Sequence, residues 1–334
     1  MTSGKRAAAW IVAAGFAAAA HATGINPGGG LIPAPDGKGG VIYREPTTEI
    51  EAAEAATGIR APDTIIPGPI SYHGGPVMLG TTRVYRIWYG WHGGPPQLPN
   101  SPPSHTDWVM QGLILGLNGS PWYNINAAYY NGAGQHVSNS LTDGGSIYLP
   151  TSATFGGALL NDDSIYNIVT SQIANHQLPL SASTVYMVVT AQNVDETSGF
   201  CRTYCAWHNH RAYSGVDIKY AFIGDGDRCP AACQPGRYDG EGFFEPNCPT
   251  GDCAADGMAN VAAHELSEAV TDPDLNAWYD ASFYENADKC AWTFGPRLGG
   301  SPADSNVYDL FLGGIPFQVQ ENWIPTNGGC AIGL

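Results

Sequence analysis

The spacing of apolar residues predicts a series of short strands in the chain beyond residue 70. Runs rich in Val, Ile, Tyr and Phe end at Gly, Pro or Asn, which is typical of strands joined by turns. These runs cover residues 77–79, 84–89, 129–130, 183–190 and 218–223. The run at 183–190 has the strongest strand pattern.

Three other segments have the composition and spacing of helices. Residues 105–117 begin with polar side chains that can cap a helix and continue with apolar residues three and four apart. Residues 162–173 carry two acids in the first turn, where the helix dipole favours negative charge. A third, Ala-rich helix is expected around His264. Because helices alternate with strands, the sequence predicts an α/β fold with a layered mixed sheet and helices.

The first 67 residues lack this pattern and predict export. Lys5 and Arg6 precede an apolar run over residues 7–20, followed by small residues suited to cleavage. The run is too short to remain as a membrane span, and no later segment is apolar for long enough. We therefore expect a secreted, extracellular protein. Its parts are a signal peptide at 1–22, a flexible linker or pro-segment at 23–67, and one α/β domain at 68–334.

The charge balance narrows the choice of partners. The chain has 30 acidic and 14 basic residues and a formal net charge of −16. Such a chain is poorly suited to bind nucleic acid or an anionic membrane through charge. A peptide or a cell-wall component is the partner that we expect.

The eight cysteines all lie between Cys201 and Cys330, and in an exported chain they are expected to form disulfides that stabilise the C-terminal half. A zinc ribbon is the rival interpretation, but it requires two-residue spacings and a reducing compartment. The simplest pairing is local, although the sequence leaves the connectivity open. It would join Cys201 to Cys205, Cys229 to Cys233, Cys248 to Cys253 and Cys290 to Cys330.

The helix around His264 carries the motif with the clearest chemistry. The sequence His264-Glu265-Leu-Ser-Glu268 resembles the zinc-hydrolase motif H-E-x-x-H, with a Glu in place of the second His. Residues four apart on a helix lie about one turn above each other, so His264 and Glu268 can reach the same ion. Glu265 points in another direction and can face a water beside that ion.

Two carboxylates downstream can complete a metal site. We predict the ligands His264, Glu268, Glu285 and Asp288, with the later pair supplying the third ligand. Glu285 is preferred, because Asp288 can be engaged by its neighbour Lys289. Zinc is the expected ion, but a second carboxylate makes the site harder, so calcium and manganese remain open.

The loop after the helix partly resembles a calcium-binding loop. The loop opens with Asp272 and Asp274 in the manner of an EF-hand, but Ala277 replaces its Gly and Phe283 replaces its final Glu. The EF-hand interpretation is therefore excluded. A looser calcium site that also uses Asp280 stays open.

Structural roles compete with these interpretations. Glu268 and Asp272 can form a solvated acidic stripe, and Pro273 can simply end the helix. His208 and His210 lie between cysteines of the expected disulfides, where packing is favoured over a ligand or substrate-binding role.

Seven short blocks follow one another between about residue 68 and the end of the chain. They are YHGGPVMLG at 72–80, IWYG at 87–90, SPWY at 120–123, TSGFC at 197–201, CAWH at 205–208, DGM at 256–258 and NAWY at 276–279. In these blocks and in their order, the chain resembles the EXORDIUM family, also called the phosphate-induced protein family. The resemblance implies an extracellular protein, and we expect a bacterial member of this family, whose plant members are secreted to the cell wall.

Two functional hypotheses follow. The first is a zincin-like, metal-dependent hydrolase, most simply a peptidase, in which Glu265 acts as the general base. The second is a non-catalytic secreted protein that binds cell-wall or extracellular components through its aromatic surface, with a structural metal or none.

Overall fold

The computed structural model describes residues 68–91, 105–239 and 241–334, so the predicted signal peptide and linker lie outside the described residues. Its centre is a five-stranded sheet with the order β3-β2-β5-β8-β7. Four strands are parallel and β7 is antiparallel to β8. The strands are β2 (Thr82–Tyr89), β3 (Leu141–Leu149), β5 (Thr184–Thr190), β7 (Ala206–Tyr213) and β8 (Val216–Ile223). The expected mixed α/β sheet is confirmed.

Connections through helices explain why most of the sheet is parallel. The chain passes from β2 to β3 through α2 (His105–Leu117), and from β3 to β5 through α4 (Asp162–Ala174). Parallel neighbours require such crossovers, whereas antiparallel neighbours can share a tight turn. Ser214 and Gly215 form that turn between β7 and β8, with φ values of 48° and 81°. Two positive φ values in succession suit the right-handed twist of a hairpin.

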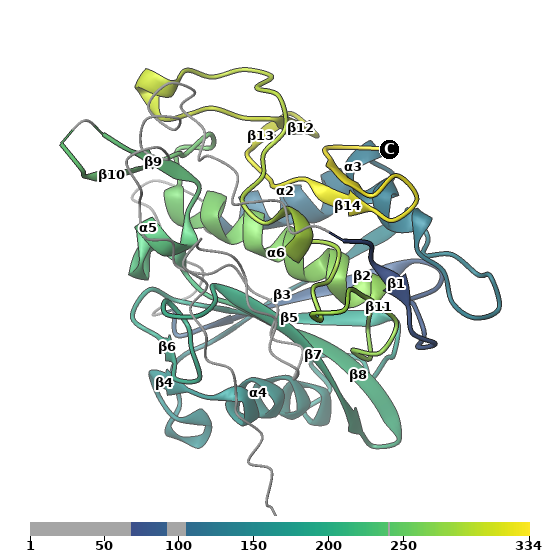
Figure 1. Cartoon of the computed structure of the whole chain (residues 1–334). Helices are drawn as coiled ribbons and strands as arrows, with labels where there is room; N and C mark the ends of the chain where they lie inside the picture. Colours follow the sequence, from purple (N-terminus) through teal and green to yellow (C-terminus); the bar gives the residue numbers. More distant parts are fainter. Residues whose placement is uncertain (1–67, 92–104, 240) are drawn as a thin grey trace, which may run out of the picture.

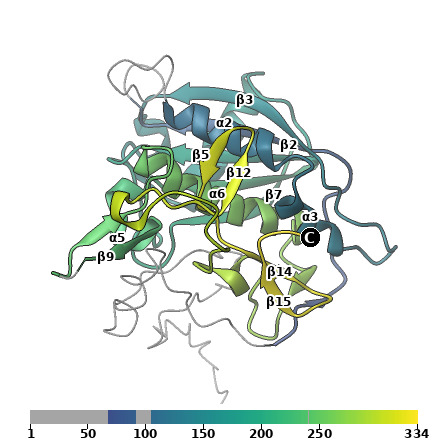
Figure 2. The ribbon, with the colours of Figure 1, turned by 90° about the horizontal axis from the view of Figure 1, so that it is seen from above.

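The helices lie on both faces of the sheet (Figure 1). Helix α4 covers one face, and α2 and α6 (Cys253–Thr271) lie on the other. In the view from above, α2 and α6 run across the sheet beneath the C-terminal segments (Figure 2). Every residue of α6 from Ala254 to Thr271 is buried, because the sheet lies below it and irregular segments cover it.

Short elements make up these covering segments and the remaining connections. The paired strands are β1 (Ser71–Tyr72) with β11 (Trp278–Tyr279), β4 (Leu159–Leu160) with β6 (Asp195–Glu196), β9 (Gly236–Tyr238) with β10 (Phe244–Pro246), β12 (Leu310–Leu312) with β13 (Ile315–Phe317), and β14 (Asn322–Ile324) with β15 (Gly329–Ala331). The short helices are α3 (Pro121–Asn124), α5 (Pro230–Cys233), η1 (Ile125–Ala128), η2 (Ala153–Phe155), η3 (Gly226–Arg228), η4 (Asp288–Cys290) and η5 (Pro302–Asp304).

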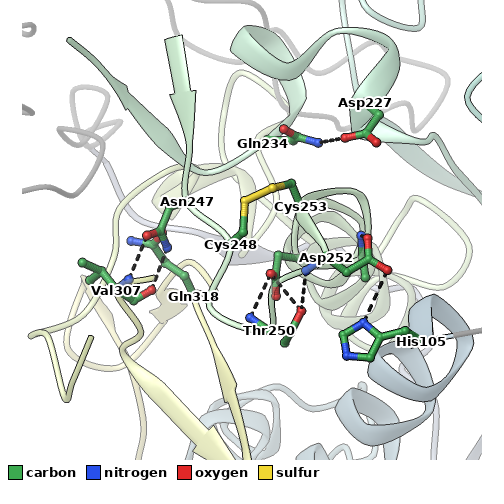
Figure 3. Close-up of a disulfide and its surroundings, with 12 residues drawn as sticks. His105, Asp227, Gln234, Asn247, Cys248, Thr250, Asp252, Cys253, Val307 and Gln318 are labelled. Atoms are coloured by element: carbon green, nitrogen blue, oxygen red, sulfur yellow. Dashed lines mark hydrogen bonds and ion pairs between the residues drawn. A yellow bond between two sulfur atoms is a disulfide. The ribbon is translucent and has the colours of Figure 1, made fainter. Parts of the chain in front are cut away.

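The N-terminal end of α6 is fixed by polar contacts and a disulfide (Figure 3). Asp252 caps the helix by accepting a hydrogen bond from the backbone N–H of Ala255 at 3.1 Å. Its other carboxylate oxygen accepts one from the Thr106 hydroxyl at 2.7 Å and lies 3.6 Å from Nδ1 of His105. The Cys248–Cys253 disulfide closes the preceding loop. The starts of α2 and α6 are thereby joined.

The sequence pattern did not predict two strands of the five-stranded sheet, β3 and β7, and both lie at its edges. The predicted helices at 105–117 and 162–173 and the inner strands are confirmed. Edge strands β3 and β7 are partly exposed and carry polar residues, so they lack the apolar run of a buried parallel strand. Two predicted strands are wrong. Residues 77–79 are irregular, and residues 129–130 contain only an isolated bridge from Tyr130 to His136.

The disulfide pairing corrects the local assignment in two of four cases. The pairs Cys248–Cys253 and Cys290–Cys330 agree with it. The other four cysteines pair across segments, because α5 and the turn before it lie beside the start of β7. The resulting bridges are Cys201–Cys229 and Cys205–Cys233, with Cα–Cα distances of 5.8 and 5.4 Å.

No helix in the described parts of the chain is long and apolar enough to cross a membrane.

Peptide mapping under non-reducing conditions tests the crossed pairing. Digestion after Glu196, Arg202, Arg211, Arg228 and Arg237 places Cys201 and Cys205 on separate peptides and keeps Cys229 with Cys233. We expect a single species of three linked peptides in mass spectrometry. Local pairing would instead give the Cys201 and Cys205 peptides joined to each other and a separate, internally bridged 229–237 peptide.

Candidate metal centre

Two parts of the fold bring the predicted site residues together. Helix α6 supplies His264, Glu265 and Glu268, and the segment that ends in η4 supplies Glu285 and Asp288. All five side chains are buried, with residue exposures between 0 and 4 %. The four predicted ligands and the predicted base therefore lie in one buried region. The acidic face is not a solvated stripe.

The first group consists of His264, Glu268 and Asp288. Nε2 of His264 lies 3.1 Å from Oε1 of Glu268 and 3.4 Å from Oδ1 of Asp288. One ligand atom from each of the three residues lies within 4.8 Å of the others. The backbone N–H of Asp288 also donates to Oε1 of Glu268 at 3.1 Å, which fixes the two carboxylates relative to each other.

Gln320 determines which nitrogen of His264 carries a proton. The Gln320 amide nitrogen donates to the carbonyl of Ala287 at 2.8 Å, so its Oε1 must be the atom that faces Nδ1 of His264, at 3.1 Å. Nδ1–H is then the donor, as in metal sites where the other ring nitrogen is the ligand. Nε2 is directed at two carboxylates, which requires either a second ring proton or a cation between them.

The second group contains a histidine that the sequence did not assign to the site. His208 of β7, Glu265 and Glu268 each offer one ligand atom, and these atoms also lie within 4.8 Å of one another. Nε2 of His208 is 3.2 Å from Oε2 of Glu285 and 3.8 Å from Oε2 of Glu268. The available signal was the alternation in β7, which places every second residue on one face, but the cysteines on both sides favoured a packing role for His208.

Several buried atoms of the cluster lack hydrogen bonds. Buried polar groups are nearly always hydrogen-bonded, so a concentration of exceptions needs an explanation. Among the described residues, no hydrogen bond reaches Oε2 of Glu268 or Oε1 of Glu285, and no side chain hydrogen-bonds the Glu265 carboxylate, which lies near the backbone of His208. Nε2 of His264 meets Oε1 of Glu268 and Oδ1 of Asp288 only as ion pairs.

Burial shifts the protonation equilibria of the cluster. It raises the pKa of Glu265 and Glu285 well above 4.5, and it raises the pKa of Glu268, with further contributions from neighbouring carboxylates. Burial lowers the pKa of His208 to about 4. Burial alone would also lower the pKa of His264, but Glu268 and Asp288 outweigh burial and raise this pKa well above 6.5. The centre therefore favours bound protons unless a cation replaces them.

Asp288 and Glu285 lie beside different histidines of the cluster. Lys289 donates to Asp280 at 2.8 Å, so the expected pair with Asp288 does not form. Asp288 faces His264, while Glu285 contacts His208 on the other side of the cluster.

The looser calcium site is not assembled in this structure, because each of its acids has other partners. Asp272 accepts two backbone N–H groups at 2.6 Å each, from Asn276 and Ala277. Asp274 and Asp280 accept hydrogen bonds from Lys219 and Lys289.

Together, the fold and the cluster define an α/β protein with a buried histidine–carboxylate centre beneath the C-terminal segments. The sequence profile of the phosphate-induced protein 1 conserved region matches residues 115–309, which include His208 and all five predicted site residues. The chain therefore belongs to the phosphate-induced protein family, as its sequence blocks suggested.

Two plant proteins show how far the similarity extends. Protein EXORDIUM-like 5 of Arabidopsis thaliana is 27% identical over 284 residues, covering 78% of this chain and 77% of its own length. Protein EXORDIUM-like 3 of the same plant is 27% identical over 253 residues, covering 70% and 71%. No solved structure matches the chain, so the zincin-like part of the expected fold rests on the motif alone.

The raised pKa values predict how the metal-free protein responds to pH. Glu265 and Glu285 hold their protons more tightly in the folded chain, because burial raises their folded pKa values well above 4.5. The free energy of unfolding must then fall as the pH rises through those values. Between pH 6.5 and 8 we expect a decrease of up to about 1.4 kcal/mol per pH unit for each titrating group, measured by urea denaturation with a chelator present.

Glu265→Gln removes one of these groups and should make the pH dependence shallower. The buried Asp225 and Asp309, each with a pKa raised to about 7 by burial, contribute a background of the same sign in both proteins. His208, whose pKa burial lowers to about 4, contributes the opposite sign in both proteins until its unfolded imidazole has lost its proton, at about pH 7.5. A stability that stays constant or rises toward pH 8 would contradict the prediction.

Proposed function

We propose that this protein holds a divalent cation, zinc in the first place, at His264, Glu268 and Asp288, and that it is a secreted metal-dependent hydrolase. The observation that carries the proposal is the orientation of His264. Its Nδ1 faces Oε1 of Gln320, and its Nε2 faces the two carboxylates. This is how a protein presents an imidazole to a metal.

The ligand spacing agrees with zinc. In a tetrahedral site with metal–ligand distances of about 2.0–2.2 Å, neighbouring ligand atoms lie roughly 3.3–3.6 Å apart. Nε2 of His264 lies 3.1 and 3.4 Å from its two carboxylate neighbours. Imidazole suits zinc better than calcium, and the additional carboxylate keeps manganese as the next choice.

Hydrolysis is supported by Glu265. Its carboxylate is fully buried beside Glu268 and His208, and no side chain of the described residues hydrogen-bonds it. Burial raises its pKa well above 4.5, toward the range in which a general base is effective near neutral pH. A divalent cation in the centre would supply Lewis-acid activation of water. Glu265 would accept the proton, and a peptide bond is the substrate that we propose.

A non-catalytic secreted binding protein is the second candidate. The side chains of the centre are all buried, and structural metal sites are closed whereas catalytic sites keep an open position. The surface also carries stacked aromatic rings that can contact an extracellular ligand. His73 stacks on Tyr279 with ring centroids 3.8 Å apart, Phe283 follows at 5.3 Å from Tyr279, and Phe283 is 51% exposed.

Secretion remains part of this proposal. The chain contains four disulfides within its described residues, and such bonds form and persist in oxidising compartments.

Elemental analysis of the purified protein tests the cation. We expect at least one zinc per chain after gel filtration, and a loss of at least about 100-fold in zinc affinity for His264→Gln, because removing a ligand costs more than the roughly 10–100-fold lost with an outer partner. His176→Gln is the matched control, since His176 is exposed and distant from the cluster in sequence. A wild-type protein that binds no zinc or manganese under mild conditions would overturn the proposal.

A library of fluorogenic peptides tests catalysis separately. We expect cleavage by the zinc-loaded wild type and a decrease of about 10²–10⁴-fold in kcat/KM for Glu265→Gln, the range attributed to a general base. The variant should still contain the cation at His264, Glu268 and Asp288. Zinc binding without cleavage of any peptide would favour the closed, non-catalytic centre.

A further inference from the structure

We propose a second cation site directly beside the first, formed by His208, Glu265 and Oε2 of Glu268. The inference rests on the proposed cation at His264, Glu268 and Asp288 and adds a second cation beside it. Glu268 then bridges two divalent cations, one on each of its carboxylate oxygens.

The two oxygens of Glu268 face different histidines. Oε1 lies 3.1 Å from Nε2 of His264, and Oε2 lies 3.8 Å from Nε2 of His208. The two histidines come from separate elements, α6 and β7, that pack against each other. A carboxylate between two imidazole nitrogens is the arrangement expected of a bridging ligand.

The unsatisfied atoms lie on the second side as well as on the first. No side chain of the described residues hydrogen-bonds either buried oxygen of Glu265, and Oε2 of Glu268 has no hydrogen bond among them. Glu265 and Glu268 are both 0 % exposed, and His208 is 1 % exposed. A cation at His264 and Asp288 leaves these three oxygens unexplained, whereas a cation beside His208 would bind them.

Two divalent cations would also balance the charge of the cluster. Glu265, Glu268, Glu285 and Asp288 carry four negative charges when ionised, and the ion pairs that reach them within the described residues come from histidine alone. One divalent cation leaves two negative charges buried, and two leave none. An uncompensated buried ion is strongly destabilising, so the doubly loaded centre is the balanced one.

Glu285 approaches the same nitrogen of His208. Its Oε2 lies 3.2 Å from Nε2, on an acid that is itself 4 % exposed. Without a cation this contact is a hydrogen bond from the ring N–H, whereas a cation on Nε2 takes the place of that proton and leaves Glu285 placed to bind the same cation. Two cations joined by a carboxylate serve the hydrolysis of phosphate esters and peptides, in which they stabilise the attacking and the leaving atom. With two cations bound, Glu265 would be a ligand of the second cation and would no longer serve as the general base.

Manganese loading of the full chain tests the second site. The secreted protein is stripped with a chelator, reloaded with Mn²⁺ and analysed for metal content and by electron paramagnetic resonance. We expect two ions per wild-type chain with an exchange-coupled signal, and one uncoupled ion per chain in His208→Gln and in Glu265→Gln. His264→Gln should also keep one ion, held at the second site.

His176→Gln is again the control, because it removes an exposed histidine that belongs to none of the candidate metal groups. It should bind two ions. One ion per wild-type chain, unaffected by His208→Gln and lost in His264→Gln, would overturn the second site and leave the first intact. No bound ion would overturn both, and two ions without exchange coupling would overturn the shared carboxylate. Circular dichroism of each variant verifies folding. If either His208→Gln or Glu265→Gln fails to fold, the other variant provides the test.

Discussion

The rest of the structure depends on the complete burial of a charged helix. Helix α6 has no exposed side after its first residue, yet its centre carries an imidazole and two carboxylates. A helix that is buried on all sides is normally apolar throughout. The acids therefore need compensation within the protein, and the sheet, the η4 segment and the C-terminal segments all supply groups that face them. Each neighbour of α6 both covers apolar surface and contributes a polar partner.

This constraint explains why packing and chemistry cannot be separated here. The alanines of α6 allow the helix to approach its neighbours closely, and five of them are at most 2 % exposed. The same close approach removes water from His264 and the carboxylates, which raises the energy of the charged forms. A centre of this kind is stabilised by protons at low pH or by cations at neutral pH. The stability of the fold and the occupancy of the centre are then two aspects of one equilibrium.

Sequence patterns could predict the parts of the fold that depend on local periodicity. Helices α2, α4 and α6 and the inner strands have strong patterns, and the helical spacing of His264 and Glu268 already placed both on one side. His208 and Gln320 could not be assigned, because they reach the centre only through the pairing of β7 and the course of the C-terminal segments. The crossed disulfides escaped prediction for the same reason, since spacing in sequence says little about which cysteines become neighbours in space.

The sequence positions of the candidate ligands divide the chain into two parts with different roles. Strands β2, β3 and β5, with the helices between them, precede residue 191 and contain no candidate ligand. Every group of the centre, from His208 to Gln320, follows them, as do all four disulfides. The first part pairs β2 with β3 and with β5 through parallel crossovers, and the second part brings His208 to Glu285, 77 residues further along the chain. A chain in which only β2, β3 and β5 have paired has therefore not yet placed any residue of the histidine–carboxylate centre.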